Sequence, residues 1–316
     1  MTVTEQLPEL FVQRLTEILP PDRFEGCLES FSLLKPTSFR VNSLRTTEEL
    51  LMDELESEGF RLTRVPWGEG VFSIESVQRR QLTESAAFSE GRIYIQGLSS
   101  ILAPMALDPR PGETVLDLAA APGGKTLQMA AMMKNRGRIS AVESVKGRFF
   151  RLKANLERHG ATLVKGYLMD GRAVGTKVPE RFDRVLLDAP CSSEARFTTR
   201  DKRSWAHWSL RKVKESARKQ KRLLDSAFRS LKPGGTLLYC TCSFAPEENE
   251  VILDGQLRRY QGQLSIEALK LPLENIQPGL VEWRGKALNG DLAGAVRILP
   301  TSEMDGFFLC RLRKAG

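Results

Sequence analysis

The chain has 316 residues, 41% of them hydrophobic and 27% charged, which is enough for two domains with a sizeable core. No apolar run is long enough to span a bilayer, and five cysteines without a secretory signal favour a reduced, cytoplasmic protein over a disulfide-stabilised one. The net charge of +8 favours a polyanionic partner such as nucleic acid, although a merely basic soluble surface would carry the same charge.

The first hundred residues predict a small α+β, RRM-like module. An amphipathic helix is expected at 7–19, stopped by Pro20 and Pro21, and a second helix at 24–34. The other expected elements are strands at 37–42, 61–65 and 70–74 and a capped helix at 46–58. Basic and aromatic residues of this module fit either RNA contact or a solvated face and core; they are Arg40, Arg45, Arg61, Arg64 and Trp67.

A bridging strand at 93–96 and a helix at 98–107 follow, and the prolines at 109 and 111 mark the entry to a second domain. We therefore expect an N-terminal RNA-binding module with a bridging helix at 1–108 and a catalytic domain at 109–316. From Thr114 onward strands alternate with helices, which is typical of a parallel sheet covered on both faces. The expected strands are 139–143, 162–168, 182–187, 236–240 and 307–312, and the helices are 126–133, 146–159 and 209–231.

The run from Val115 to Thr126 predicts a buried strand, a tight Pro-Gly-Gly turn and a helix start. Such a turn lets the backbone approach a ligand and offers free N–H groups to an anion. A phosphate-binding P-loop would need glycine at position 119, which is Ala119, and the spaced dinucleotide fingerprint is absent because Gly123 and Gly124 are adjacent. A methyltransferase turn holding S-adenosylmethionine fits better, and a turn without a ligand stays open.

Acidic residues and a thiol follow the predicted strands. In an open α/β sheet, ligands gather at the carboxyl ends of strands, so these positions indicate a site. Glu143 is placed to bind ribose hydroxyls, and Asp170 either accepts a hydrogen bond from an adenine amine or shapes a turn. Two further strand ends carry Asp188 with Cys191, and Cys242. Cys27, Cys240 and Cys310 are expected in the core, and too few histidines and paired cysteines are present for a zinc site.

Taken together, these motifs resemble the NOL1/NOP2/Sun family of RNA cytosine-5 methyltransferases over nearly the whole chain. The matching segments are 40–44, 94–96, 118–126, 188–192, 231–235, 239–243, 246–250 and 305–308. The chain departs from the family pattern at three places. Family members often have an acidic residue where this chain has Gly97, and Ser-Gly where it has Ser192-Ser193. The acid at the end of the second strand is usually Asp, and here it is Glu143.

The resemblance implies a Rossmann-like methyltransferase sheet, mostly parallel with an antiparallel C-terminal strand, and S-adenosylmethionine as cofactor. It implies Cys242 as the thiol that attacks carbon-6 of cytosine, Cys191 as the residue that assists release, and Asp188 as the partner of the cytosine amine. Lys125 is expected to orient the base or lower a cysteine pKa. The expected cofactor-binding residues are Ala119, Ala120, Ala121, Pro122, Gly123, Gly124, Lys125, Glu143, Arg148, Asp170 and Asp188.

The substrate expected from this resemblance is an unpaired or flipped cytosine of ribosomal or transfer RNA. A basic run with tryptophans follows Cys191, which suits stacking and phosphate contact, although at least one tryptophan is expected to pack under the loop. The candidate RNA-binding residues are Arg40, Arg200, Lys202 and Trp205. A monomer is expected, and the alternatives are a catalytically silent RNA-binding protein and, less favoured, a P-loop enzyme.

Overall fold

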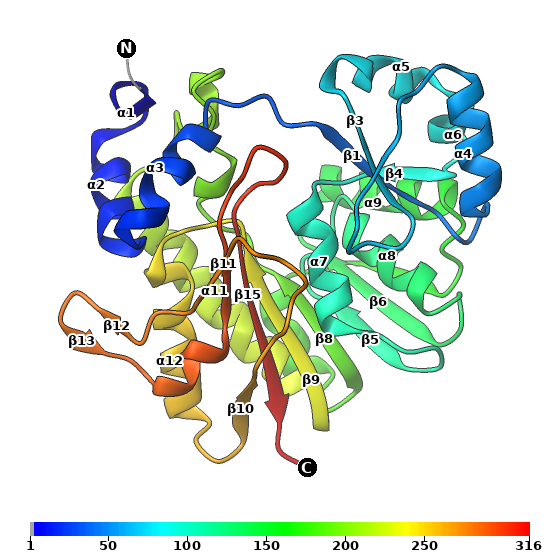
Figure 1. The fold of residues 1–316 in the computed structure, drawn as a ribbon. Helices are drawn as coiled ribbons and strands as arrows, with labels where there is room; N and C mark the ends of the chain where they lie inside the picture. The colour runs from blue at the N-terminus through cyan, green and yellow to red at the C-terminus, as the bar shows by residue number, and fades with distance from the viewer. Residues whose placement is uncertain (1–2) are drawn as a thin grey trace.

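The computed structural model describes residues 3–316, which form an N-terminal α+β unit and a larger α/β unit (Figure 1). The chain begins with the helices α1 (Val3–Gln6), α2 (Glu9–Ile18) and α3 (Pro21–Ser30). The prediction for α3 was wrong by several residues at both ends. Pro21 starts this helix because proline lacks an N–H and has a helical φ, which suits the first turn.

The N-terminal sheet is antiparallel, with the order β2-β3-β1-β4 among the described residues. With a helix between the first two strands and helices before the fourth, this is the predicted RRM-like arrangement. Its elements are β1 (Thr37–Val41), α4 (Glu48–Ser57), β2 (Thr63–Arg64), β3 (Val71–Ile74), α5 (Arg79–Glu84), α6 (Ala86–Ser89) and β4 (Ile93–Ile95). Strand β2 is shorter than predicted, and the sequence did not predict α5 and α6.

The described residues of the second unit form a nine-stranded sheet with the order β11-β14-β15-β9-β8-β5-β6-β7, and β10 pairs with β15. The ladders among β7, β6, β5, β8 and β9 are parallel, and β15 is antiparallel to β9, which confirms the predicted fold class. Its nine strands are β5 (Thr114–Asp117), β6 (Arg138–Glu143), β7 (Val164–Leu168), β8 (Phe182–Asp188), β9 (Leu231–Thr241), β10 (Leu264–Glu267), β11 (Ile276–Pro278), β14 (Val296–Ile298) and β15 (Phe307–Lys314). Two short strands, β12 (Glu282–Trp283) and β13 (Lys286–Ala287), pair with each other in a separate two-stranded sheet.

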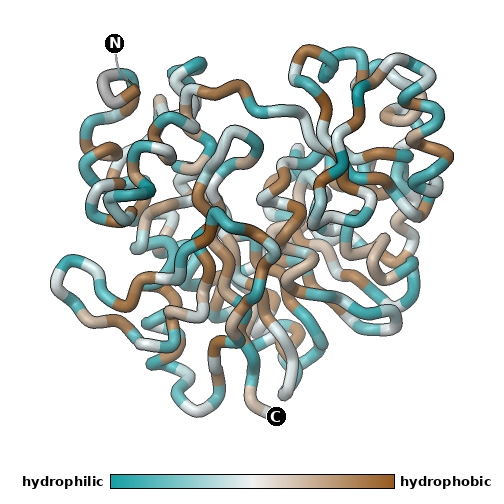
Figure 2. Tube along the Cα trace, in the orientation of Figure 1, coloured by the Kyte–Doolittle hydropathy of each residue, from teal (hydrophilic) through white to brown (hydrophobic). Residues whose placement is uncertain are grey.

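Helices cover both faces of this sheet, as the alternation of elements predicts. They are α7 (Leu98–Leu107), α8 (Gly124–Met132), α9 (Lys146–Arg158), α10 (Val174–Lys177), α11 (Leu210–Ser230) and α12 (Glu250–Arg259). One hydrophobic core lies under α7, α8 and α9 and continues to α2 and α3, and a second lies under α11 and α12. Figure 2 shows hydrophobic residues along the central strands and polar residues in the outer loops.

In the second unit, the start of β9 differs most from the sequence prediction. Strand β9 begins at Leu231 rather than at residue 236, because the Pro-Gly-Gly segment continues the strand as an irregularity. Phe182 of β8 pairs with Leu231 of β9, and the next pair is Arg184 with Thr236, so β9 contains extra residues between the two pairs. The predicted division between residues 108 and 109 stays a prediction; in the structure α7 packs on β8, β9 and β15.

No helix within residues 3–316 is long and apolar enough to cross a membrane.

Candidate active site

The Pro-Gly-Gly turn after β5 brings the N-terminus of α8 against the N-terminal sheet. Gly123 has a φ of 114°, which L side chains rarely adopt. A Cβ on Gly124 would lie 2.7 Å from Cε1 of Tyr94 on β4, so only glycine allows this approach. Arg40 of β1 fixes the same contact, because its guanidinium donates to the Gly124 carbonyl oxygen at 3.2 Å and to the Gln96 side-chain oxygen at 3.3 Å.

A cavity of about 440 Å³ lies at the carboxyl ends of β5 and β8, where the sequence places the site. It brings together most of the predicted site residues. Those lining it are Asp117, Ala119, Ala120, Ala121, Pro122, Gly124, Lys125, Arg148, Asp188, Ala189, Pro190, Cys191, Ser193, Arg196 and Cys242, with Tyr94, Ile95, Gln96 and Ser100 from the first hundred residues. A second cavity of about 330 Å³ contains Glu143, Asp170, Arg172 and Lys219 and shares Ala119, Arg148 and Pro190 with the first.

Lys125 and Asp188 form a partly buried ion pair in the lining of the larger cavity, with Nζ and Oδ2 separated by 2.6 Å. Burial disfavours the charged lysine, but the charge of Asp188 and its hydrogen bond outweigh burial, so the pKa of Lys125 is raised. The other carboxylate oxygen of Asp188 lies 3.7 Å from the Cys240 Sγ. The ion pair therefore fixes the Lys125 cation and the Asp188 acceptor in position beside the thiols.

Asp117, at the end of β5, is 1% exposed, and its Oδ2 accepts from the Thr126 hydroxyl at 2.6 Å. Its Oδ1 is buried without a hydrogen-bond partner among the described residues. Burial raises the pKa of this carboxyl to about 6. Because an unpartnered buried acceptor is costly, Oδ1 marks a place for a donor on a ligand.

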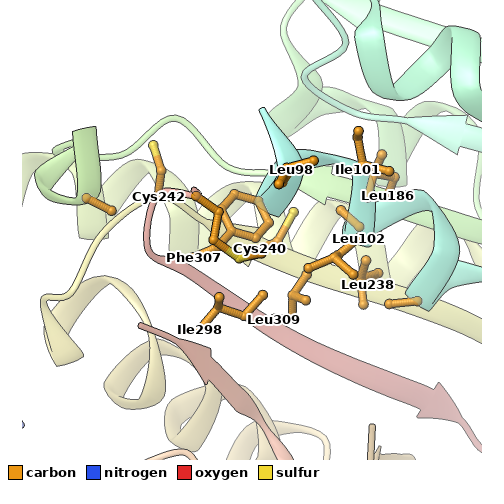
Figure 3. Packing of buried hydrophobic residues seen from close by; sticks show 14 of the residues in the cluster. Leu98, Ile101, Leu102, Leu186, Leu238, Cys240, Cys242, Ile298, Phe307 and Leu309 are labelled. Carbon is orange, nitrogen blue, oxygen red and sulfur yellow. The ribbon is translucent and has the colours of Figure 1, made fainter. Parts of the chain in front are cut away.

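The two thiols predicted for the reaction lie next to each other, with 3.2 Å between the Sγ atoms of Cys191 and Cys242. Figure 3 shows Cys242 at the left edge of the labelled residues of the hydrophobic core that contains Cys240. The hydrogen bond from Cys191 lowers the pKa of the Cys242 thiol, and the positive charge of Arg196 adds to this. The same hydrogen bond and burial raise the pKa of Cys191. Cys242 is therefore the thiolate of the pair and Cys191 the thiol.

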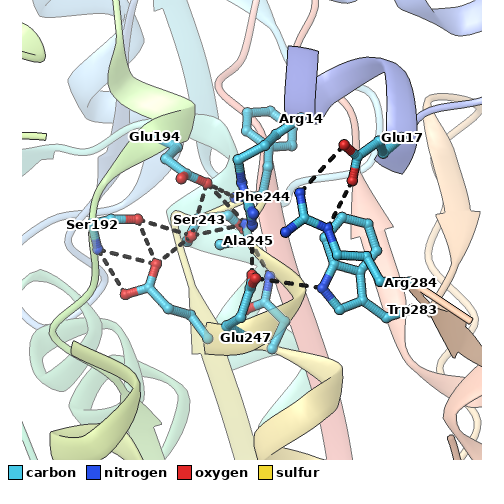
Figure 4. Close-up of polar contacts among 12 residues, drawn as sticks. Arg14, Glu17, Ser192, Glu194, Ser243, Phe244, Ala245, Glu247, Trp283 and Arg284 are labelled. Atoms are coloured by element: carbon cyan, nitrogen blue, oxygen red, sulfur yellow. Dashed lines mark hydrogen bonds and ion pairs between the residues drawn. The ribbon is translucent and has the colours of Figure 1, made fainter. Parts of the chain in front are cut away.

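Two buried glutamates join the loops that carry these cysteines (Figure 4). Glu248, from the second loop, accepts from the Ser192 N–H at 2.9 Å and from the Ser192 hydroxyl. Glu194, from the first loop, accepts from the N–H groups of Phe244 and Ala245, each at 2.9 Å. Burial raises the pKa of Glu248 to about 7 and also raises that of Glu194. Each loop thus supplies a carboxylate to the backbone of the other, which sets the separation of the thiols.

Helix α2 supports the second of these loops. Arg14 is 2% exposed and its guanidinium lies 2.6 Å from a carboxylate oxygen of Glu247, and Trp283 donates to the other oxygen of Glu247 at 3.4 Å (Figure 4). Phe11 of the same helix packs edge-on against Phe197 of the first loop. The segment before the RRM-like sheet therefore supports both loops that carry the cysteines, although none of its described residues lines the larger cavity.

The smaller cavity contains the acids predicted to bind a nucleoside. Glu143 is 3% exposed and accepts from the Val145 N–H at 2.8 Å, and Arg148 donates to the Ala121 carbonyl oxygen at 2.7 Å. Asp170 makes a bidentate ion pair with Arg172, two residues along the chain. The hydrogen bonds from Arg172 lower the pKa of Asp170 despite partial burial, so Asp170 presents a carboxylate at this end of the cavity.

The predicted RNA-binding residues lie apart from one another. Arg40 is 4% exposed and its described contacts are with protein groups; burial lowers its pKa to about 10. Arg200 and Lys202 are exposed on the loop after Cys191, and Trp205 is half-buried, with its ring 6.1 Å from that of Phe197. The RNA contacts of all four stay predictions.

Trp208 donates to Glu194 at 2.8 Å, which confirms that at least one tryptophan packs under the loop. Sequence reasoning missed the residues that hold the site together; these are Arg14, Tyr94, Gln96, Glu194, Arg196, Gln220 and Glu248. Segments 94–96 and 246–250 were noted only as matching the family, and the basic run after Cys191 only as a candidate RNA contact, so no residue of this set was assigned a role in holding the site. Among residues 3–316, no group of three or more His, Cys, Asp or Glu is placed to hold a metal ion.

Comparison with known proteins gives two family matches. Residues 104–313 match the 16S rRNA methyltransferase RsmB/F family, and residues 7–97 match the N-terminal domain of 16S rRNA methyltransferase RsmF. The chain is 39% identical over 315 residues to a tRNA (cytosine(49)-C(5))-methyltransferase of Pyrococcus abyssi, covering 98% of this chain and 97% of that protein.

It is also 36% identical over 313 residues to ribosomal RNA small subunit methyltransferase F of Vibrio campbellii, and spans 63% of that longer protein. A solved methyltransferase homologue from Pyrococcus horikoshii has a TM-score of 0.84 and 33% identity, and the match covers 99% of this chain and 98% of that one.

Proposed function

Because the chain belongs to the 16S rRNA methyltransferase RsmB/F family, we propose that it transfers a methyl group from S-adenosylmethionine to carbon-5 of a cytosine in RNA. Family membership confirms the resemblance drawn from the sequence motifs. The observation that carries the proposed reaction is the pair of thiols 3.2 Å apart in one cavity with the Lys125–Asp188 ion pair. This combination supplies a nucleophile, an acid and a fixed charge pair at one place.

The two neighbouring cavities, which share Ala119, Arg148 and Pro190, fit the proposed cofactor. S-adenosylmethionine would supply an electrophilic methyl group on a sulfonium, which the cytosine ring can accept once it is activated. In the smaller cavity, Glu143 would bind the ribose hydroxyls and Asp170 the adenine amine. In the larger cavity, the unpartnered Oδ1 of Asp117 and the glycine turn would bind the amino and carboxylate groups.

The thiols divide the work on the base. The Cys242 thiolate adds to carbon-6 of cytosine, and the electron pair moves through the ring so that carbon-5 becomes nucleophilic. Asp188 accepts from the cytosine amine while Lys125 stays paired with it and balances its charge. In the later step a base takes the proton from carbon-5 and the electron pair of that C–H bond expels the Cys242 thiolate; Cys191, which lies beside Cys242, would assist this release.

Two related proteins act on different RNAs by name, one on transfer RNA and one on ribosomal RNA, so the proposed substrate is an RNA of either class. We further propose that the protein works in the cytoplasm as a monomer. Buried, mutually bonded cysteine loops support an active enzyme over a catalytically silent RNA-binding protein, because the latter would not need the thiols kept in contact.

Single substitutions of the two cysteines test the proposal. After incubation with RNA and labelled S-adenosylmethionine, Cys242→Ala should form neither product nor covalent adduct. Cys191→Ala should attack and methylate but release slowly, so that a protein–RNA complex survives denaturing gel electrophoresis. Cys310→Ala, which removes a buried thiol outside the cavity, is the matched control and should behave as wild type. Absence of an adduct with every variant, together with unchanged methylation by Cys242→Ala, would contradict the proposed roles.

A further inference from the structure

Helix α11 carries an unusual share of the positive charge of the chain. Its 21 residues include eight Lys or Arg and two Asp or Glu. The helix therefore contributes +6 to a chain whose net charge is +8. A surface this biased indicates a polyanionic partner for this one element rather than a generally basic protein.

The charges lie on the face opposite the core. Val213, Gln220 and Leu224 are among the residues that α11 buries against the sheet side. The exposed residues include Arg211, Lys212, Lys214, Arg218, Lys219, Lys221 and Arg222. Lys214, Arg218 and Arg222 follow one another at four-residue intervals, so they form one stripe about 12 Å long, from about 1.5 Å rise per residue. We call these three residues the α11 stripe.

The stripe is free to bind a ligand. Arg211 is paired with Glu215, and Arg229 with Asp225, both four residues apart. By contrast, within residues 3–316 no ion pair or side-chain hydrogen bond is formed by Lys214, Arg218 or Arg222. Like charges four residues apart destabilise a helix, so the α11 stripe does not serve the stability of the fold.

Helix α11 lies beside the proposed active site. Its Ser209 cap follows directly on Trp208, which bonds Glu194 of the first cysteine loop. Gln220 donates to the Pro190 carbonyl oxygen at 3.0 Å, and Lys219 lines the cavity that contains Glu143 and Asp170. A polyanion whose reacting unit enters the cavity can therefore continue over the outer face of α11.

We propose that the α11 stripe binds phosphates of the RNA strand that flanks the target nucleotide; this rests on the proposed function. Two further exposed cations, Arg200 and Lys202, lie on the loop that connects Cys191 to α11. An anionic membrane is the less suitable partner. None of the exposed large hydrophobic side chains among the described residues lies on α11, and a helix that lies on a membrane needs them.

The test uses the full chain with Lys214→Gln, Arg218→Gln and Arg222→Gln combined, and a control with Arg79→Gln, Lys270→Gln and Lys286→Gln. The control removes the same charge from exposed cations elsewhere. Binding of a fluorescent single-stranded RNA of about 30 nucleotides is measured by anisotropy over a salt series. Loss of three phosphate contacts should flatten the slope of log affinity against log salt by about 2, from about 0.7 per contact.

If the variant and wild type have equal affinity when extrapolated to 1 M salt, this change of slope gives a roughly hundredfold loss of affinity at 0.1 M salt. A charge-keeping variant, Lys214→Arg with Arg218→Lys and Arg222→Lys, should bind as wild type, which separates lost charge from misfolding. Equal flattening in the control, or dependence on the stripe for anionic lipid vesicles but not for RNA, would overturn the inference. Because binding is measured without methyl transfer, a protein that binds through the stripe but does not methylate would refute the proposed function alone.

Discussion

Replacing Glu248 by Gln should raise the stability of the variant relative to wild type as the pH rises. Glu248 is fully buried and its pKa is raised by burial from 4.5 to about 7. The unfolded chain therefore ionises this carboxyl first. Its contribution to stability is fully present below pH 4.5 and is lost as pH rises through about 7. Glutamine does not titrate, so the variant lacks this loss.

Glutamine also fits the contacts of Glu248. Its carbonyl oxygen can accept from the Ser192 N–H and the Gln220 amide, as Oε1 does at 2.9 Å and 3.2 Å. Its amide NH₂ then replaces Oε2 and faces the hydroxyls of Ser192 and Ser243, which can rotate to accept. The substitution therefore removes the titration while leaving few buried groups unpaired.

The magnitude follows from the pKa values of this carboxyl in the folded and unfolded chain. Between pH 5 and pH 8 the difference in unfolding free energy between variant and wild type should change by about 2.5 kcal/mol, because a tenfold change in proton affinity is worth about 1.36 kcal/mol. For this chain length the unfolding entropy is about 0.66 kcal/mol/K, from about 2.1 cal/mol/K per residue. The gap between the melting temperatures should therefore change by about 4 °C in favour of the variant.

Melting curves of both proteins, followed by circular dichroism at pH 5 and pH 8, measure this gap directly. Glu25→Gln removes an exposed carboxyl from α3 and is the control for net charge. The reasoning fails if the melting temperatures of wild type and Glu248→Gln change in parallel between the two pH values. In that case Glu248 would be ionised throughout, and it would join the cysteine loops as a charged acceptor.

Three further outcomes are expected. Glu143→Ala should weaken S-adenosylmethionine binding by calorimetry, at about 1.5–3 kcal/mol per lost hydrogen bond to a charged group, and unchanged affinity would remove it from the cofactor site. Arg196→Gln should raise the pH at which iodoacetamide alkylates Cys242, because a cation beside the thiolate is lost; an unshifted profile would leave Cys191 as the whole cause. Gly124→Ala places a Cβ 2.7 Å from Tyr94, so cofactor affinity should drop in a folded protein, and wild-type binding would show that the turn can move.

The central strands were predictable because each combines a buried apolar run with a clear end. Strand β6, for example, was expected at 139–143 and is Arg138–Glu143, and Glu143 ends it in the predicted position. The region between β9 and β15 was not predicted. Its strands β10 to β14 have two to four residues and include Lys286–Ala287 and Ile276–Pro278, which show no apolar alternation. Pairing with the antiparallel side of the large sheet decides the structure of β10, β11 and β14, and β12 and β13 pair with each other; the local sequence records neither kind of pairing.

The site was predictable where chemistry follows a strand end and unpredictable where residues act on one another across loops. Asp188, Cys191 and Cys242 stand at such ends, and the structure brings them into one cavity. Glu194 and Glu248 are separated along the chain, and neither has a role until the two loops face each other. A buried carboxylate that accepts from another loop has no sequence signal of its own, because its partners are backbone N–H groups.

Residues on both faces of the N-terminal sheet contact other parts of the protein. Phe39 and Phe72 point toward the core under α4, so the helices cover one face. Arg40 and Tyr94 belong to the opposite face, and there they contact the turn at Gly124. At β1 and β4 neither face is free for stacking bases. The module therefore contributes Tyr94, Ile95 and Gln96 to the lining of the cavity, and the RNA contacts proposed above lie elsewhere, on the loop after Cys191 and on α11.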